Sequence, residues 1–209
     1  MKILETQPLA LEGVHLVVYA RFQDPRGYFT ETFRRSDFDH LSFLSGTVFR
    51  QCNESYSRQG VVRGLHFQWA PPMGKLVRTV QGRMIDLVLD VRKGSPTFGR
   101  AIAVDLPADP EASQSSWIWV PAGFAHGNAF PEPTTIEYFC TAEYNPDSEG
   151  GISPLSPEIN WSLCNPDLFS TVRGLLDGGR LSERDRDAPT LAQWAADPRS
   201  EAFVYRPVP

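Results

Sequence analysis

Two histidine-containing segments, set about 60 residues apart among runs of strand-forming residues, constrain the fold of this chain most. The first, residues 60–68, has the sequence GVVRGLHFQ, and the second, residues 121–128, has the sequence PAGFAHGN. Each combines a histidine with glycines in an apolar stretch. A single histidine in an apolar strand is usually a core residue with a satisfied hydrogen bond. Two such segments in one β-rich chain instead favour a barrel with two related motifs.

The pattern between residues 14 and 141 is typical of an all-β unit. Short stretches rich in Val, Ile, Phe and Tyr alternate with Gly and Pro turn signals, and a short helix is expected over residues 36–45. The tripeptide Gln81-Gly82-Arg83 predicts a tight turn between two strands. Such spacing indicates a sandwich or barrel of the jelly-roll kind. The predicted strands cover residues 15–19, 28–33, 47–53, 61–68, 76–80, 84–91, 101–106, 116–120 and 135–141.

The remainder of the chain changes character. Residues 142–164 are rich in turn formers, and residues 165–209 have helical patterning, with a helix over 168–176 that ends at Gly178-Gly179 and a second short helix opened by Pro189. A length of 209 residues fits one all-β domain. We therefore predict a single domain, residues 1–209, with 165–209 as a helix-containing C-terminal extension.

Composition excludes several classes of function. The net charge of −5 argues against a nucleic-acid surface. No run approaches the roughly 20 apolar residues of a membrane span, and residues 1–13 lack a signal-peptide pattern. The three cysteines, an odd number without metal or redox spacing, favour a reduced, cytoplasmic protein.

The two histidine segments resemble the motifs of the cupin barrels. A metal-binding cupin places a second histidine two residues after the first, but Gln68 stands there. His126 occupies the position where other cupins keep a metal ligand, and one histidine does not make a metal site. We therefore expect neither a metal nor another cofactor, and keep a metal-dependent cupin enzyme as the alternative.

Six blocks, in the same order, resemble the dTDP-4-dehydrorhamnose 3,5-epimerase family of nucleotide-sugar epimerases. The resemblance implies a metal-free cupin jelly roll, usually a homodimer. It also implies that the substrate is a dTDP-4-keto-6-deoxyhexose and that C3, C5 or both are inverted. The blocks are DPRGYF (24–29), RGLHFQ (63–68), GKLVR (74–78), DVRKGSPTFG (90–99), PAGFAHG (121–127) and LSERD (181–185).

The chemistry of such a reaction explains the residue types. Removing a proton from the carbon beside the C4 ketone makes an enolate. This step needs a base that works near neutral pH, a cation at the developing oxyanion, and an acid that returns a proton to the opposite face. A histidine and a tyrosine can serve as that base and that acid.

His66 is the candidate base, and a core histidine is the structural alternative. The resemblance assigns Asp185 as its carboxylate partner, which would fix the tautomer. Ser182-Glu183-Arg184-Asp185 also resembles a capping box, so Asp185 could instead belong to a helix start. Tyr138 aligns with the proton-donating tyrosine of the family, and packing in an aromatic strand is its alternative.

Two cations complete the expected centre. Lys75 is the candidate cation near the C4 oxygen, with a surface charge after a turn as its alternative. Arg63 lies in an apolar strand, where an unpaired charge is costly. The family implies that Arg63 contacts sugar or phosphate, and a buried salt bridge to Asp86 is the alternative.

The resemblance also assigns residues that contact the substrate. The segment from Arg26 to Glu31 reaches the site of the neighbouring subunit in the family, which implies a homodimer with strand exchange there. His126 is equally compatible with a hydrogen-bonded core role. The substrate-binding residues expected from the family are Arg26, Glu31, Gln51, Asn53, Arg63, His126, Tyr144, Glu149 and Arg184.

The chain also departs from the family pattern. Cys52 and Glu54 flank Asn53 where the family often has Asp-Asn-His, and Asn128 replaces a hydrophobic residue after His126-Gly127. Residues 165–180 form a longer segment than in compact members. These departures leave open which carbons are inverted. A single-centre epimerase and a non-catalytic sugar-nucleotide-binding cupin remain as alternatives.

Overall fold

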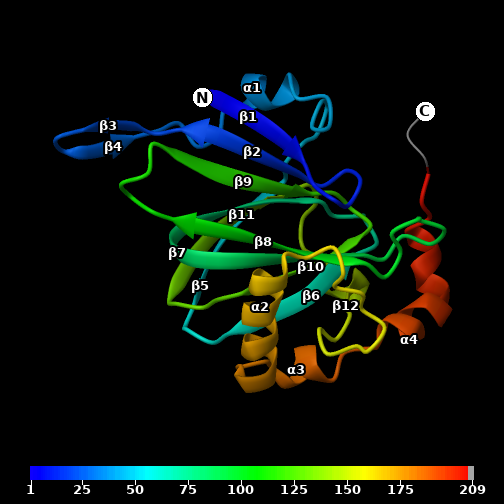
Figure 1. The fold of residues 1–209 in the computed structure, drawn as a ribbon. Coiled ribbons are helices and arrows are strands. Elements are labelled where there is room, and N and C mark those ends of the chain that lie inside the picture. The colour runs from blue at the N-terminus through cyan, green and yellow to red at the C-terminus, as the bar shows by residue number, and fades with distance from the viewer. Residues whose placement is uncertain (207–209) are drawn as a thin grey trace.

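One long strand, β7 (Lys75–Asp90), runs through both layers of the β-structure and organises the fold (Figure 1). The computed structural model describes residues 1–206 of the 209. Its other strands are β1 (Ile3–Pro8), β2 (His15–Ala20), β3 (Phe22–Asp24), β4 (Gly27–Phe29), β5 (Gln51–Ser57), β6 (Val62–Gln68), β8 (Ala101–Ala108), β9 (Gln114–Val120), β10 (Phe124–Ala129), β11 (Thr134–Cys140) and β12 (Glu149–Gly151). Its helices are α1 (Arg35–Asp39), α2 (Pro166–Gly178), α3 (Glu183–Arg186) and α4 (Leu191–Ala196), with 3₁₀ turns at Pro146–Ser148 and Pro198–Ala202.

The strands form two antiparallel layers that share β7. The first layer has the order β1-β2-β9-β7-β11-β5 and contains the first half of β7. The second has the order β8-β7-β10-β6-β12 and contains the second half of β7. The molecule is therefore mainly β, and the predicted jelly-roll class is confirmed.

The predicted tight turn at residues 81–83 is wrong, because β7 passes through this point without reversing. Gln81 still pairs with β11, whereas Gly82 already pairs with β8. Gly82 has φ +84°, and a Cβ there would lie 2.4 Å from the carbonyl oxygen of Pro133. Glycine is required here for a bend that carries one strand from the first layer to the second, as at the corners of orthogonally packed sheets.

Other boundaries also differ from the sequence prediction. The helix expected over residues 36–45 is shorter in the structure, where α1 ends at Asp39. The strand expected over residues 28–33 is also shorter, because β4 ends at Phe29. Strand β1 was not predicted, because its residues are mostly exposed and lack an apolar alternation. In the described part of the chain it is an edge strand with β2 as its one partner, so its backbone partner decides its conformation more than its side chains do.

Side chains alternate along the strands, so that some pack on the outer face of a layer and others point into the interior between the layers. In β6, Leu65 and Phe67 pack outward against the C-terminal helices, so His66 lies on the inner face. In β11, Ile136 packs into the interior between the layers and Phe139 packs on the outside, which places Tyr138 inside as well. The polar inner side chains therefore gather at one end of an otherwise apolar interior.

The C-terminal segment covers the outer face of the second layer (Figure 1). Val172, Leu191 and Trp194 are buried in the same apolar cluster as Leu65 and Phe67. As predicted, a helix covers residues 168–176. This helix is α2, which is slightly longer than predicted, with Asn165 as its N-cap and Gly179 after its end. Shared packing of this kind favours our prediction of a single domain. No helix in residues 1–206 is long and apolar enough to cross a membrane.

Candidate active site

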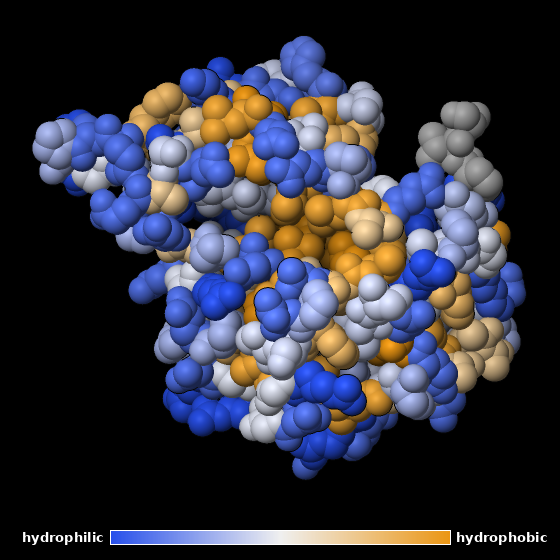
Figure 2. All heavy atoms as spheres, in the orientation of Figure 1, coloured by the Kyte–Doolittle hydropathy of each residue, from blue (hydrophilic) through white to orange (hydrophobic). Residues whose placement is uncertain are grey.

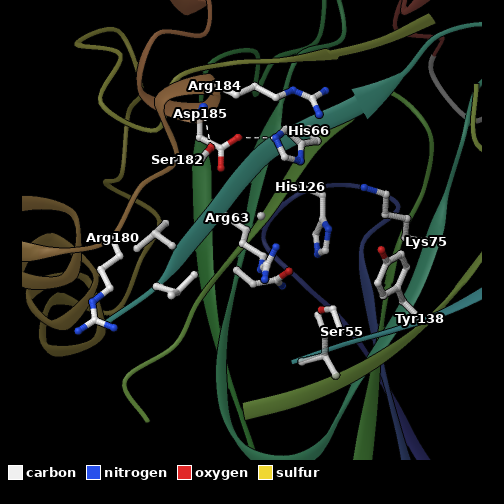
Figure 3. A pocket seen from close by; sticks show the side chains of 15 residues that line it. Ser55, Arg63, His66, Lys75, His126, Tyr138, Arg180, Ser182, Arg184 and Asp185 are labelled. Carbon is white, nitrogen blue, oxygen red and sulfur yellow. Dashed lines mark hydrogen bonds and ion pairs between the residues drawn. The ribbon is translucent and has the colours of Figure 1, made fainter. Parts of the chain in front are cut away.

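A cavity of about 400 Å³ opens at the polar end of the interior, between the two layers (Figure 3). His66 enters it from β6 in the second layer, and Tyr138 enters from β11 in the first. Lys75 lies at the start of β7, in the half of that strand that belongs to the first layer, beside β11. The cavity thus presents an imidazole from the second layer, and a phenol and the Lys75 side chain from the first.

His66 and Asp185 lie far apart in the sequence but form a close pair in the fold. His66 Nε2 lies 2.7 Å from Asp185 Oδ1, and the backbone N–H of Gly64 donates to Asp185 Oδ2 at 3.4 Å. Burial disfavours the charged Asp185 carboxylate, but the hydrogen bonds from His66 and Gly64 outweigh it and hold the pKa of Asp185 below its usual value. Asp185 is therefore an ionised partner that can stabilise an imidazolium on His66.

Both interpretations of the Ser182–Asp185 block hold at once. The Ser182 hydroxyl accepts from the backbone N–H of Asp185 at 3.1 Å and caps α3. The Asp185 carboxylate turns the other way, toward His66 (Figure 3). The cap fixes the backbone of Asp185, and this fixed backbone orients the carboxylate.

Burial shifts the pKa values of Lys75 and Tyr138 in opposite directions. Lys75 is half-buried and has no ion-pair or hydrogen-bond partner within residues 1–206, and burial lowers its pKa from the ordinary lysine value. Burial and the nearby Cys140 thiol raise the pKa of Tyr138, although the Asn53 amide partly offsets this. Tyr138 therefore keeps its proton through neutral pH, whereas burial disfavours the charged form of Lys75, which a developing oxyanion nearby would favour again.

A second cavity of about 350 Å³ adjoins the first, and His66, Lys75 and Tyr138 line both. Its wall is a connected set of the expected substrate-binding residues. Gln51 Nε2 donates to Asn53 Oδ1 at 2.9 Å, and Gln51 Oε1 accepts from the Tyr144 backbone at 2.8 Å. The three candidate catalytic side chains thus lie where the two cavities meet, as a substrate with two parts would require.

Glu149 links this wall to α3. Its carboxylate accepts from the Tyr144 hydroxyl at 2.9 Å and forms an ion pair with Arg184. Burial opposes its ionisation, but Arg184 and Tyr144 outweigh that effect and lower the pKa of Glu149. The acceptor role of Glu149 raises the pKa of Tyr144 in turn.

Arg63 and His126 also line the first cavity. Their hydrogen-bond partners exclude the salt bridge between Arg63 and Asp86 that was considered from the sequence. Arg63 Nε donates to the Ser57 hydroxyl at 2.9 Å, and the alternative of a salt bridge to Asp86 is wrong. Asp86 instead bonds to His126 Nε2 at 2.7 Å. Arg63 therefore has no carboxylate partner within the described part of the chain, and it can contact an anionic ligand.

Arg26 and Glu31 lie away from both cavities of their own chain. Arg26 is on the β3–β4 hairpin, which projects from the body of the molecule (Figures 1 and 2). Among residues 1–206, its one ion-pair partner is Asp24. Glu31 pairs with the N-terminal ammonium group and Arg34. A single chain thus brings together eleven of the thirteen predicted site residues, and these two remain outside.

Comparison with known proteins bears directly on this site. The model of the dTDP-4-dehydrorhamnose 3,5-epimerase family matches residues 8–193. The dTDP-4-dehydrorhamnose 3,5-epimerase of Sinorhizobium fredii is 40% identical over 192 residues, which cover 90% of this chain and 89% of the relative. The chain belongs to the dTDP-4-dehydrorhamnose 3,5-epimerase family. Membership confirms the resemblance seen in the six sequence blocks, and with it the epimerase class of isomerase.

Solved structures of this epimerase family match the fold over nearly the whole chain. The dTDP-6-deoxy-D-glucose 3,5-epimerase of Legionella pneumophila, in complex with dTDP-4-keto-L-rhamnose, covers 98% of this chain at 29% identity, and 100% of that chain is matched, with a TM-score of 0.79. ChmJ, a 3′-monoepimerase from Streptomyces bikiniensis in complex with dTDP-quinovose, covers 89% of this chain and 87% of its own at 31% identity, with a TM-score of 0.74. The family therefore contains both double and single epimerases on one architecture.

The first cavity also has lining residues that the sequence did not identify as site residues, among them Asn128 and Arg180. Asn128, noted only as a departure, lines the cavity and donates to Asp86. Arg180 lies at its rim, where its side chain points away from the centre (Figure 3). The signal for Asn128 was present, because a polar residue on an inner strand position needs a buried partner.

Gln68, the residue that distinguishes this chain from metal-binding cupins, has a defined structural role. Its side-chain NH₂ group donates to the carbonyls of Pro71 and Glu143, and its oxygen accepts from the backbone of Asn145. Gln68 thus ties two loops together at the edge of the second cavity. In residues 1–206 no three His, Cys, Asp or Glu side chains gather in a way that could hold a metal ion. Metal independence stays a prediction.

Proposed function

We propose that this protein inverts C3, C5 or both in a dTDP-4-keto-6-deoxyhexose, in deoxysugar biosynthesis. The observation that carries the proposal is the placement of the His66–Asp185 pair and Tyr138 on opposite layers of one cavity. A sugar ring held between the layers would present one face to the imidazole and the other to the phenol. Inversion requires that arrangement, whereas simple binding does not.

Each step of the proposed reaction uses a group with the appropriate charge. His66, held by Asp185, takes the proton from the carbon beside the ketone. Lys75, half-buried and without a partner within residues 1–206, stabilises the negative charge that develops on the C4 oxygen. Tyr138, whose raised pKa keeps it protonated, delivers a proton to the opposite face. The cycle closes when His66 returns its proton to solvent and Tyr138 is reprotonated.

The adjoining cavity would hold the rest of the substrate. Gln51, Asn53, Tyr144 and Glu149 form its hydrogen-bonded wall, and Arg184, which lines the first cavity, pairs with Glu149. Arg63 also lines the first cavity and has no carboxylate partner among the described residues. A guanidinium group suits a diphosphate because it presents several donors in one plane. We assign these residues to recognition of the nucleotide and the sugar hydroxyls.

The direct test is incubation with dTDP-4-keto-6-deoxyglucose in D₂O, followed by NMR of C3 and C5. Deuterium and inversion at both carbons are expected for a double epimerase. Deuterium and inversion at one carbon only would establish the single-centre alternative, which the similarity to ChmJ supports. No deuterium at either carbon would contradict the proposal and favour a sugar-nucleotide-binding protein.

The same assay tests metal independence. Full exchange activity after exhaustive chelation is the expected result, because the three proposed groups supply base, cation and acid without a metal. Activity that is lost with chelator and restored by a divalent ion would favour the metal-dependent alternative.

We also propose a homodimer in which the β3–β4 hairpin reaches the site of the partner subunit. The hairpin carries Arg26 far from its own cavities, and Phe29 on the same hairpin is 68% exposed. A second copy that covers this hairpin would bury its aromatic side chains and add Arg26 to a site that lacks it. The three free cysteines support the expected cytoplasmic location of such an assembly.

Mixed dimers test this arrangement. Arg26→Ala and His66→Asn protomers, each weakly active alone, should regain activity when they are co-expressed. Random pairing gives about one intact site in four, because only mixed dimers combine an intact hairpin with an intact base. If the co-expressed protomers are no more active than the two separate variants, Arg26 does not serve the partner.

A further inference from the structure

The side-chain amide of Asn128 has a fixed orientation in the wall of the first cavity. Its Nδ2 donates to Asp86 Oδ2 at 3.0 Å and lies 3.0 Å from the sulfur of Met84. A carboxylate oxygen and a thioether sulfur are acceptors, so the amide nitrogen is the atom that faces them. The amide oxygen, Oδ1, has no hydrogen-bond partner within residues 1–206. Asn128 therefore presents an unpaired acceptor on the side of its amide that faces away from Asp86.

This oxygen is open to the cavity rather than enclosed in the protein. Asn128 lines the first cavity, whereas Asp86 and Met84 lie behind its wall. Asp86 Oδ1 is an enclosed oxygen without a partner in residues 1–206, but Asn128 Oδ1 is not enclosed. Because buried polar atoms are normally paired, an open and unpaired acceptor in a cavity wall is available to a ligand.

The strand register places Asn128 at one end of the proposed sugar site. His126 pairs with His66 on β6, and Asn128, two residues further along β10, pairs with Arg63. His66 lines both cavities, whereas Asn128 and Arg63 line the first and not the second. Residues two apart along a strand are separated by about 6.6 Å. Asn128 thus lies about one such step beyond the candidate base, on the side away from the second cavity.

The surroundings of Asn128 suit a sugar hydroxyl. Arg63 is its partner across the strands and has no carboxylate partner among the described residues. Ser55 lines the same cavity from β5 in the first layer (Figure 3). A hydroxyl group both donates and accepts, so it can donate to Asn128 Oδ1 and still accept from Arg63 or Ser55. A carbonyl oxygen cannot donate and would leave the Asn128 oxygen unpaired.

We propose that Asn128 is a specificity-determining residue that accepts a hydrogen bond from a ring hydroxyl of the hexose. This inference deepens the proposed function and rests on it for the position of the sugar between His66 and Tyr138. The proposed 4-keto-6-deoxy substrate carries ring hydroxyls at C2 and C3, so one of these two is the donor. A site built to bind a hydroxyl discriminates against the analogue that lacks it. Asn128 stands where the family pattern has a hydrophobic residue, so the contact is particular to chains with a polar residue there.

Binding calorimetry with dTDP-6-deoxyglucose and its 2-deoxy and 3-deoxy analogues tests the contact without catalysis, since none of them has the C4 ketone. In Asn128→Leu, dTDP-6-deoxyglucose should bind about 3- to 10-fold more weakly than in the wild type, the scale of one hydrogen bond. The affinity for dTDP alone should not change. One of the two analogues should bind the variant and the wild type equally well, because it lacks the hydroxyl that Asn128 contacts. Equal weakening of dTDP and all three sugars, or no weakening at all, would overturn the proposal.

Two further variants separate the contact from packing. Asn128→Thr keeps a hydroxyl that can donate to Asp86 and replaces the amide oxygen with a methyl group, so it should show the same sugar-specific loss even if the leucine variant does not fold. Met84→Leu removes the sulfur contact of the amide and should leave every affinity unchanged. A threonine variant that binds dTDP-6-deoxyglucose as tightly as the wild type would contradict the role of the oxygen. Exchange in D₂O reports the proposed function separately, so wild-type exchange without a sugar-specific loss in Asn128→Leu would overturn this inference alone.

Discussion

The Asp185→Asn substitution perturbs the proposed base with little change in shape. It removes the negative charge 2.7 Å from His66 Nε2 but keeps an oxygen that can accept from that nitrogen. The backbone N–H of Asp185 still caps α3 through Ser182. Because the pKa of Asp185 is lowered in the folded protein, its contribution to stability is complete above its ordinary value of 3.8 and is lost only as the pH falls through the lower folded value. The charge is therefore present throughout the assay range.

The geometry sets the expected size of the effect. A hydrogen bond between charged groups contributes about 1.5–3 kcal/mol. His66 is 28% exposed, so solvent screens part of the interaction and the lower end of that range applies. A loss of about 1.5–2 kcal/mol in stabilising the imidazolium corresponds to roughly a 10- to 30-fold fall in kcat/KM. The acid limb of the profile should also move to lower pH by about one unit, because the imidazolium loses its counter-charge.

Deuterium exchange at C3 and C5, measured by NMR from about pH 5 to 9, tests both effects. Glu183→Gln is the matched control, since it removes the same charge from the exposed side of the same helix and should leave the profile unchanged. A fall in kcat/KM in the Asp185→Asn variant without any movement of the acid limb would refute the reasoning. It would mean that the carboxylate does not act through the charge of His66.

Two further predictions follow from groups near the site. Burial lowers the pKa of Lys75 and raises that of Tyr138, so the alkaline limb of exchange should report Lys75, and Lys75→Arg should move this limb to higher pH. An alkaline limb that stays in place in Lys75→Arg would assign it to another group. Gly64→Ala should lower the free energy of unfolding by about 2–3 kcal/mol in urea, because φ is +107° and the new Cβ would lie 2.7 Å from Gly127 Cα. Gly46→Ala, with a positive φ but open space, should cost about 1 kcal/mol, and equal losses in the two variants would contradict the importance of the close approach.

Local patterns in the sequence predicted the β class and the helical C-terminus but not how the layers are joined. Gly82 shows the limit most clearly. A glycine between two apolar runs is typical of a turn, and it also permits a positive φ inside a continuous strand. Only the pairing of Gln81 with one layer and Gly82 with the other decides between these outcomes.

The candidate site was predictable where a residue type matched one chemical role, and less so where two roles were open. Asp185 could not be assigned from its neighbours, because its backbone caps a helix while its carboxylate contacts a strand more than 100 residues away. Arg63 and Asp86 carry opposite charges, but each has a nearer partner in the fold. Pairings of this kind depend on strand register, which a single sequence does not display.

The division of labour between His66 and Tyr138 is tested most directly by comparing exchange with inversion in two variants. In D₂O, His66→Asn should lose both exchange and inversion by roughly 10²–10⁴-fold, because no enolate forms. Tyr138→Phe keeps the base and the Lys75 cation, so it should still introduce deuterium while inverted product falls much further. Normal exchange in His66→Asn, or equal losses of exchange and inversion in Tyr138→Phe, would contradict the placement of base and acid on opposite layers of the cavity.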